Sequence, residues 1–198
     1  MLGTLTAVVL VVGTIILVVC AVSLTGGSWS RLGQLKLRAL WLLIGAFLVQ
    51  TALDYVDVPA RYLDFGFAVL LVTYALILTF CWLNRRVSGM WVVAIGVCLN
   101  ALVISLNQGM PTMDYPVQRN GKTVYVSIER TVKHRPAGGD DLLPFLGDQL
   151  NVPVYGFRED IFSIGDVVIA LGIADVCFEA SRRPRRRGVY LTEDANSA

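Results

Sequence analysis

The chain has 198 residues, of which 55% are hydrophobic and only 16% are charged, and its formal net charge is +2. Soluble domains usually carry about 25% charged residues, so the composition argues against an ordinary soluble domain and favours an integral membrane protein. The net charge says little by itself, whereas the positions of the charges are informative.

Five apolar blocks of about 20 residues follow one another along the chain. They are residues 4–24, 37–55, 65–83, 90–106 and 161–180. A helix of this length crosses a hydrocarbon core of roughly 30 Å, and in lipid its backbone groups must bond within the segment. The blocks lack the alternating polar positions of barrel strands. We therefore predict an all-α integral membrane protein: a five-helix transmembrane bundle in one domain, residues 1–180, and a basic, then polar, cytoplasmic tail at 181–198.

The basic residues of the loops fall on one side of this bundle. The loops after the first and third blocks and the tail hold Arg31, Lys36, Arg38, Arg85, Arg86, Arg182, Arg183, Arg185, Arg186 and Arg187. The stretch at the end of the second block and after it, "DYVDVPARYLD" (54–64), has one Arg against three Asp. The positive-inside rule then predicts an N-terminus outside and a C-terminus in the cytoplasm, in a multi-pass protein of the inner membrane.

The five arginines 182, 183, 185, 186 and 187 directly follow the fifth block. Arginines in this position contact anionic lipid headgroups, so we expect the lipid bilayer itself to be a partner. The run lacks interleaved aromatic residues and a folded platform, and no nucleic-acid binding is expected.

Motifs for catalysis, metal or cofactor are missing from the sequence. The four cysteines lie within apolar blocks without a CxxC pair, and there is one histidine. This pattern indicates packing residues and no zinc site. The chain has no GxSxG, HExxH, P-loop or GxGxxG motif, so no cofactor is expected.

The long segment between the fourth and fifth blocks, residues 107–160, lies outside in this topology. Its "VQRNGKTVYVSIERTV" places an Asn-Gly pair between runs rich in Val and Tyr, which predicts a short β-hairpin. Its "LLPFLGDQLNVPVYGF" is broken by Pro and Gly, which excludes a long helix there.

Three motifs of the outer half occur in a recognisable order: "NQGMPT" (107–112), "LPFLGD" (143–148) and "FSIGDVVIALG" (162–172). With "RLGQLKLRALWLLIGAFLVQ" after the first block, they resemble the domain-of-unknown-function family 5317. Members are small bacterial multi-helix membrane proteins without an assigned activity. The resemblance covers nearly the whole chain and implies the topology but no reaction. Residues 117–135 depart from it, because the family has a helix-like stretch there.

Polar residues gather at the predicted outer ends of the helices. Small or polar residues recur at helical spacing around Asp166 in the fifth block and around Asn100 in the fourth, a pattern that lets membrane helices approach closely. Asp166 lies five residues inside its block, and Asp175 lies on the opposite face near the inner boundary, so the two cannot form one site. The candidate cluster is Gln50, Asp54, Asn100, Asn107 and Asp166, capped by His134 and Asp148.

Three interpretations of this cluster remain open. It is a hydrogen-bonded cluster that holds the helices together, a ligand or substrate site, or a set of unrelated positions. The absence of catalytic motifs favours a non-enzymatic accessory, scaffold or assembly protein with a membrane protein partner. The alternative is a membrane-embedded enzyme, or a small-molecule or lipid binder, with a polar site at the outer mouth. Asp166 would serve there as a general base or a cation-binding group.

Overall fold

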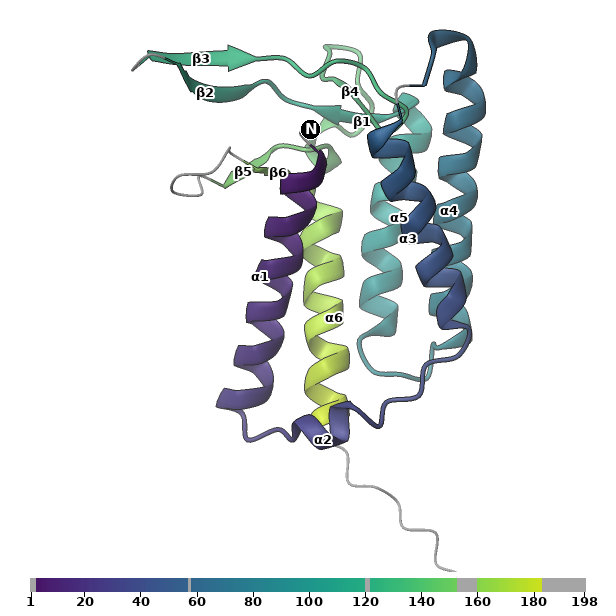
Figure 1. Ribbon diagram of the computed structural model, residues 1–198, viewed down its shortest axis with the longest axis vertical. Helices are drawn as coiled ribbons and strands as arrows, with labels where there is room; N and C mark the ends of the chain where they lie inside the picture. The colour runs from purple at the N-terminus through teal and green to yellow at the C-terminus, as the bar shows by residue number, and fades with distance from the viewer. Residues whose placement is uncertain (1–2, 57, 120–121, 153–159, 183–198) are drawn as a thin grey trace, which may run out of the picture.

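The structure is a computed structural model that describes residues 3–56, 58–119, 122–152 and 160–182. Within these residues the chain is mostly helical. The long helices are α1 (Gly3–Leu24), α3 (Leu40–Tyr55), α4 (Leu63–Leu83), α5 (Met90–Asn107) and α6 (Ile164–Arg182), and a single turn, α2 (Trp29–Leu32), follows α1. The long helices run side by side, and successive long helices alternate in direction along the chain, so that the neighbours α1 and α6 run the same way (Figure 1).

Each of the five predicted blocks contains one long helix, which confirms their helical character. Two boundaries differ from the prediction by three residues, and the others differ by two residues or fewer. The helix predicted from residue 37 begins at Leu40, because Ala39 adopts a left-handed conformation with φ 53°. The helix predicted from residue 161 begins at Ile164, because residues 160–162 form a strand.

Short strands gather at one end of the helices, which we call the strand end (Figure 1). They are β1 (Met110–Thr112), β2 (Tyr115–Arg119), β3 (Lys122–Val126), β4 (His134–Pro136), β5 (Leu150–Val152) and β6 (Asp160–Phe162), with the 3-10 turns η1 (Ala60–Tyr62) and η2 (Pro144–Leu146). β2 and β3 pair antiparallel, which confirms the predicted hairpin. β5 pairs antiparallel with β6, and β1 pairs in parallel with β4; neither pair was predicted.

The helices pack in the order α1, α6, α5, α4, α3. Glycines bring α5 and α6 together most closely. A Cβ added to Gly96 would lie 2.7 Å from the carbonyl oxygen of Gly165, and one added to Gly172 would lie 2.6 Å from the backbone nitrogen of Val93. The two backbones are therefore in direct contact, because small residues at a helix interface let the helices approach closely.

Two apolar cores hold the bundle. The core at the strand end contains Leu70, Tyr74, Val97, Val103, Ile104, Met110, Val132 and Leu146. It joins α4 and α5 to the segment between α5 and α6, and Gly66 leaves room for Val132 there, since an added Cβ would lie 2.7 Å from Val132 Cγ2. The second core contains Leu42, Phe80, Cys81, Met90 and Val176.

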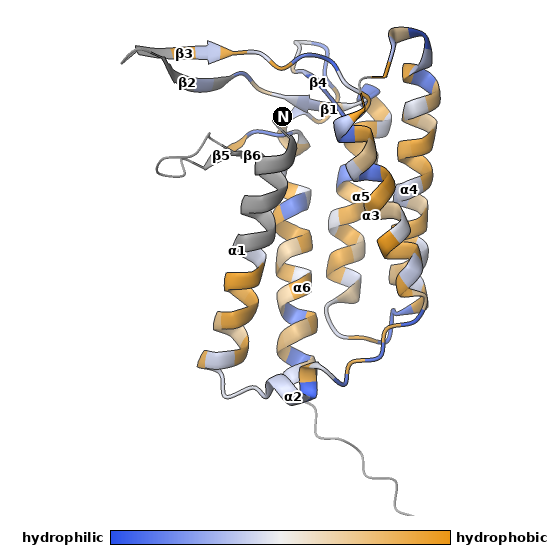
Figure 2. Ribbon diagram, in the orientation of Figure 1, coloured by the Kyte–Doolittle hydropathy of each residue, from blue (hydrophilic) through white to orange (hydrophobic). Residues whose placement is uncertain are grey.

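The opposite end carries the basic loop residues Arg31, Lys36, Arg38, Arg85 and Arg86 with Arg182, and we call it the basic end. Between the two ends most of the helix residues that Figure 2 colours are apolar, with polar residues at intervals along α6. Large exposed apolar side chains include Phe47, Leu48, Phe65, Val72, Ile95, Leu102 and Leu171. Among the described residues, two helices are long and apolar enough to cross a membrane, Ala60–Leu83 and Met90–Asn107, and Gly13–Leu24 and Leu40–Tyr55 are shorter apolar helices.

Candidate functional site

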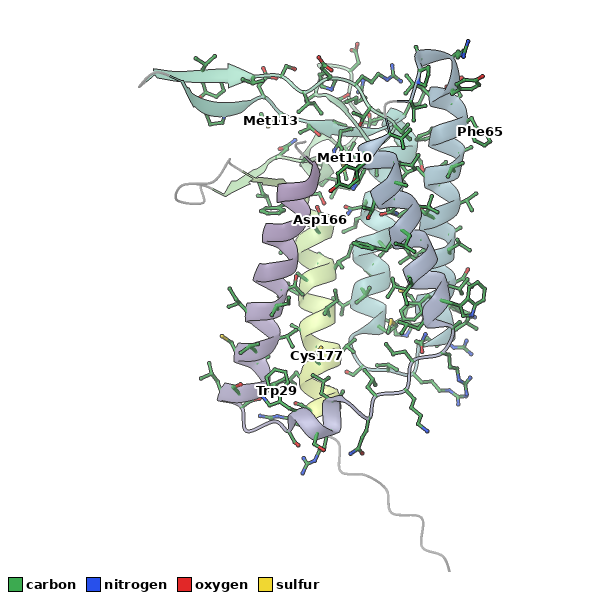
Figure 3. The ribbon with its side chains drawn as sticks, viewed as in Figure 1. Trp29, Phe65, Met110, Met113, Asp166 and Cys177 are labelled. Atoms are coloured by element: carbon green, nitrogen blue, oxygen red, sulfur yellow. The ribbon has the colours of Figure 1, made fainter. Side chains whose placement is uncertain are left out.

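Asn100 of α5 and Asp166 of α6 meet near the strand end of the bundle, and Figure 3 shows Asp166 in this position near the start of α6. The Nδ2 of Asn100 donates to Oδ1 of Asp166 at 2.8 Å. The Oδ1 of Asn100 accepts from the Oγ of Ser163 at 2.9 Å. Both ends of a buried amide are therefore satisfied by α6, and the two helices are joined by polar contacts as well as by glycines.

Ser163 and Asp166 also form the N-terminal cap of α6. The backbone nitrogen of Asp166 donates to the Oγ of Ser163 at 3.0 Å, and the backbone nitrogen of Ser163 donates to Oδ2 of Asp166 at 3.1 Å. This reciprocal pair is a capping box, which satisfies two backbone donors that a helix start leaves free. The carboxylate also lies at the positive end of the helix dipole.

The capping box corrects the depth predicted for Asp166. Because α6 begins at Ile164, Asp166 lies in its first turn and not five residues inside the helix. Gly165, between the two cap residues, leaves no room for a side chain, since a Cβ there would lie 1.9 Å from Oδ1 of Asn100. The "SIGD" of the sequence is thus a helix cap built around the amide of Asn100.

Gln50 and Asp54 of α3 do not join Asp166 but have partners of their own. The Nε2 of Gln50 donates to the Oγ1 of Thr73 in α4 at 2.8 Å. Asp54 accepts from the Nζ of Lys133 at 3.3 Å, and both side chains are partly exposed. These contacts fasten α3 to α4 and to the strand end.

Asn107, the last residue of α5, clamps a loop. Its Nδ2 donates to the carbonyl oxygen of Leu142 at 2.9 Å, and its Oδ1 accepts from the backbone nitrogen of Leu142 at 2.8 Å. The same Nδ2 donates to the carbonyl oxygen of Val103, one turn earlier in the helix. The side-chain amide of Asn107 therefore bonds both backbone groups of Leu142, as a neighbouring strand would do.

Asn84 repeats this arrangement at the basic end, and sequence reasoning missed it. It follows α4, and its amide bonds both backbone groups of Arg38, at 2.8 Å and 2.9 Å, and the carbonyl oxygen of Phe80. The signal in the sequence was a lone Asn at the end of an apolar block, as at Asn107.

His134 and Asp148 meet at the strand end, together with Thr112, which sequence reasoning also missed. The Nδ1 of His134 lies 3.1 Å from Oδ2 of Asp148. The Oγ1 of Thr112 donates to the same Oδ2 at 3.3 Å and lies 3.5 Å from the same Nδ1. A catalytic triad needs the hydroxyl at the ring nitrogen opposite the carboxylate. Here both groups lie at Nδ1, so the three residues do not have the geometry of a catalytic triad.

The three outer motifs come together around this cluster. Asp148 of "FLGD" donates its backbone N–H to the carbonyl oxygen of Pro111 in "NQGMPT" at 2.9 Å, and Met113 donates to the carbonyl oxygen of Asp148 at 3.2 Å. Gly147 allows this approach, because a Cβ there would lie 2.5 Å from the Pro111 oxygen. Gln149 then donates to the carbonyl oxygen of Phe162, which precedes "SIGD".

A groove opens between α1 and α6 at the level of Asp166. Its volume is about 270 Å³, and its lining residues are Gly13, Thr14, Leu17, Phe162, Asp166, Val167, Ala170 and Leu171. Asp166 is the one charged residue among them, and it stands at the end of the groove nearest the strands.

The predicted lipid-contact arginines are described only in part. Arg182 donates to the carbonyl oxygen of Thr25 at 2.7 Å, and its guanidinium lies over the ring of Phe178. Arg183, Arg185, Arg186 and Arg187 lie outside the described residues. Asp175, in the half of α6 nearer the basic end, accepts from the Oγ of Ser88 at 3.2 Å. Within the described residues, no group of three or more His, Cys, Asp or Glu side chains could hold a metal ion.

Comparison with known families matches residues 34–178 to a family of unknown function, DUF5317. The chain belongs to the DUF5317 family. No curated protein and no solved structure matches it. The match includes α3, α4, α5, most of α6 and all three outer motifs. The contacts among "NQGMPT", "FLGD" and "SIGD" therefore lie within the part of the chain that the DUF5317 family covers.

Proposed function

We propose that this DUF5317 protein is a five-span protein of the bacterial inner membrane. Two helices that meet the length and hydropathy of a membrane span support this, and so do the apolar outward faces of the others. Water-soluble proteins rarely expose contiguous apolar patches larger than a few hundred Å². The domain would comprise residues 1–180, and residues 181–198 would form a cytoplasmic tail.

The basic end would face the cytoplasm, with the N-terminus and the strand end outside. The positive-inside rule supports this orientation. Trp29, Trp41, Trp82 and Trp91 lie at or near the basic end and are exposed, as residues at a lipid–water interface would be. Arginines of the tail would then lie against anionic lipid headgroups.

Reporter fusions test this topology. Alkaline phosphatase, which is active outside, and a fluorescent protein, which fluoresces inside, would be fused after residue 28, in the 84–88 loop, after Gly138 and at the C-terminus. We expect phosphatase activity only at Gly138 and fluorescence at the other three positions. Phosphatase activity at the C-terminus would overturn the proposed orientation.

Within the membrane, the protein would act as a non-enzymatic accessory or scaffold protein. One observation carries this proposal: every residue of the predicted polar cluster is engaged by a partner within the chain. An active site needs a group within about 3 Å of a reacting atom. Polar groups that bond helices and loops to one another are better suited to holding the outer surface in a fixed shape than to reacting with a substrate.

The β2–β3 hairpin is the part of that surface best placed to meet a protein partner. It projects sideways beyond the helices at the strand end (Figure 1). Tyr125 is 70% exposed, and Val124 and Val126 beside it are also exposed. Aromatic residues are enriched at protein interfaces, and a two-stranded ribbon has free edges that a further strand can pair with.

Site-specific photocrosslinking in cells tests the partner role. A photoreactive residue at position 125 is compared with one at position 65, where Phe65 is 71% exposed on α4. We expect one protein adduct from position 125 and none from position 65. When the crosslinker is placed on the protein identified in this way, the same adduct should form. No adduct at 125, or the same adduct at both, would contradict the proposal.

A further inference from the structure

The groove between α1 and α6 is built from small and apolar residues with a carboxylate at one end. A Cβ added to Gly13 would meet nothing within 4 Å, so this glycine borders open space. On the facing side of α6, the small side chain of Ala170 also leaves space. Leu17, Val167 and Leu171 supply the rest of the apolar lining. The volume of about 270 Å³ is close to the lower limit of roughly 300 Å³ for small-ligand pockets.

The carboxylate of Asp166 keeps hydrogen-bonding capacity that no hydrogen bond among the described residues uses. An ionised carboxylate has about four lone-pair sites. Asp166 accepts one hydrogen bond from Asn100 and one from the backbone of Ser163, both uncharged donors. No lysine, arginine or histidine among the described residues lies within ion-pair distance of it. A charge beside an apolar groove at the edge of a membrane is costly unless a cation pairs with it.

We propose that this groove binds a phospholipid with a primary-amine headgroup, whose ammonium pairs with Asp166 and whose acyl chain lies between α1 and α6. An ammonium group presents three N–H donors and a positive charge, which complements the free sites of the carboxylate. Asp166 lies in the first turn of α6, at the depth where a headgroup meets the chains. The inference rests on the proposed membrane topology.

Charge complementarity favours a primary-amine phospholipid over the other molecules that could occupy an apolar groove. A second copy of the chain, or an apolar helix of another protein, would fill the groove but leave the carboxylate without a cation. A quaternary-amine lipid would supply the charge without an N–H donor, and an anionic lipid would place a like charge beside Asp166. The order of affinity is therefore primary amine, then quaternary amine, then anionic headgroup.

The experiment measures lipid binding to the full-length, delipidated protein by native mass spectrometry. Phosphatidylethanolamine, phosphatidylcholine and phosphatidylglycerol with identical chains are added in turn. We expect phosphatidylethanolamine to bind about tenfold more tightly than phosphatidylcholine, which corresponds to about 1.4 kcal/mol. Equal binding of the three lipids overturns the proposal.

A charge-relocation variant tests the role of Asp166 while it keeps the packing. In the double variant Asn100→Asp/Asp166→Asn, position 100 accepts from Ser163 Oγ and from the new amide, and position 166 still accepts from the Ser163 backbone. The charge moves to a residue that is 5% exposed and does not line the groove. We expect the preference for phosphatidylethanolamine to disappear. Retention of that preference refutes the pairing with Asp166.

A second variant tests the groove itself. Gly13→Leu would fill it, and Gly45→Leu is the matched control, because Gly45 also has nothing within 4 Å of an added Cβ but lies on α3. We expect Gly13→Leu to weaken phosphatidylethanolamine binding about tenfold and Gly45→Leu to leave it unchanged. Equal effects of the two variants contradict the proposal. Reporter fusions read the topology independently, so an unaltered protein that shows the expected topology but binds the three lipids equally would overturn only the lipid site.

Discussion

Asn100 and Asp166, which lie 66 residues apart in the chain, are joined by a 2.8 Å hydrogen bond that links the start of α6 to the middle of α5. The same carboxylate closes the capping box with Ser163. The folding of α6 and its docking on α5 therefore depend on one set of atoms. These contacts give the ionisable Asp166 a structural role at the start of α6.

Replacing Asn100 should destabilise the protein measurably. Asn100→Ala removes a donor to Asp166 and an acceptor for Ser163, and it leaves both groups partly unsatisfied. We expect a loss of about 1–3 kcal/mol in the free energy of unfolding, measured by reversible denaturation in detergent. Ser105→Ala is the control, because the exposed Ser105 hydroxyl bonds only the carbonyl oxygen of Ala101 in its own helix. Equal stability of the two variants would show that the Asn100 network contributes nothing.

Replacing a glycine of the α5–α6 contact with alanine should lower stability far more than replacing a glycine that faces open space. Gly165→Ala places a methyl group 1.9 Å from Oδ1 of Asn100, so the amide or the helix must move. We expect a marked fall in thermal stability in detergent. In contrast, Gly45→Ala meets nothing within 4 Å and removes a flexible residue from a helix, which should leave stability unchanged or raise it by up to about 1 kcal/mol. A lower stability for Gly45→Ala than for Gly165→Ala would contradict the close packing of α5 on α6.

The helices could be predicted from sequence because each is a long apolar block, and the β2–β3 hairpin because its strands flank an Asn-Gly pair. The parallel pairing of β1 with β4 could not, because it joins segments more than 20 residues apart that are only three residues long. Such pairing depends on the packing of Val132 and Leu146 into the core at the strand end.

The candidate site was predicted in part, for a similar reason. The glycine and asparagine stripes of α5 and α6 indicate which faces meet, because the helical period is regular. The partner of each polar group cannot be deduced from that period. Gln50 faces Thr73, Asp54 faces Lys133 and Asn107 faces a loop. The Ser163–Asp166 capping box was present in the sequence, but apolar residues precede it, so the helix start was placed three residues too early.

The two asparagine clamps, Asn84 and Asn107, should have separate local effects. Asn84→Ala frees the backbone of Arg38 at the basic end, and Asn107→Ala frees the backbone of Leu142 at the strand end. Hydrogen exchange followed by mass spectrometry should show faster exchange around residue 38 in the first variant and around residue 142 in the second. Each variant is the control for the other. Faster exchange at both ends in either variant would show that the clamps act on the whole bundle instead.

The buried Asp148 should matter far more to stability than the more exposed Asp54, although each faces one basic residue. Asp148 is 5% exposed, and its Oδ2 lies within 3.3 Å of both His134 and Thr112. Asp148→Ala removes the carboxylate that faces His134 and leaves the buried Thr112 hydroxyl with the carbonyl oxygen of Met110 as its remaining acceptor. We expect a loss of about 1–3 kcal/mol in the free energy of unfolding.

Asp54→Ala is the matched comparison for Asp148→Ala, since it breaks only the partly exposed contact with Lys133, and such ion pairs contribute about 0–1 kcal/mol. The two variants would be measured side by side by reversible denaturation, at low and at high salt. High salt should reduce the effect of Asp54→Ala and leave that of Asp148→Ala nearly unchanged, because salt screens exposed charges more than buried ones. If Asp54→Ala proves the more damaging, the strand end is held by its surface ion pair and the Thr112–His134–Asp148 cluster is dispensable for stability.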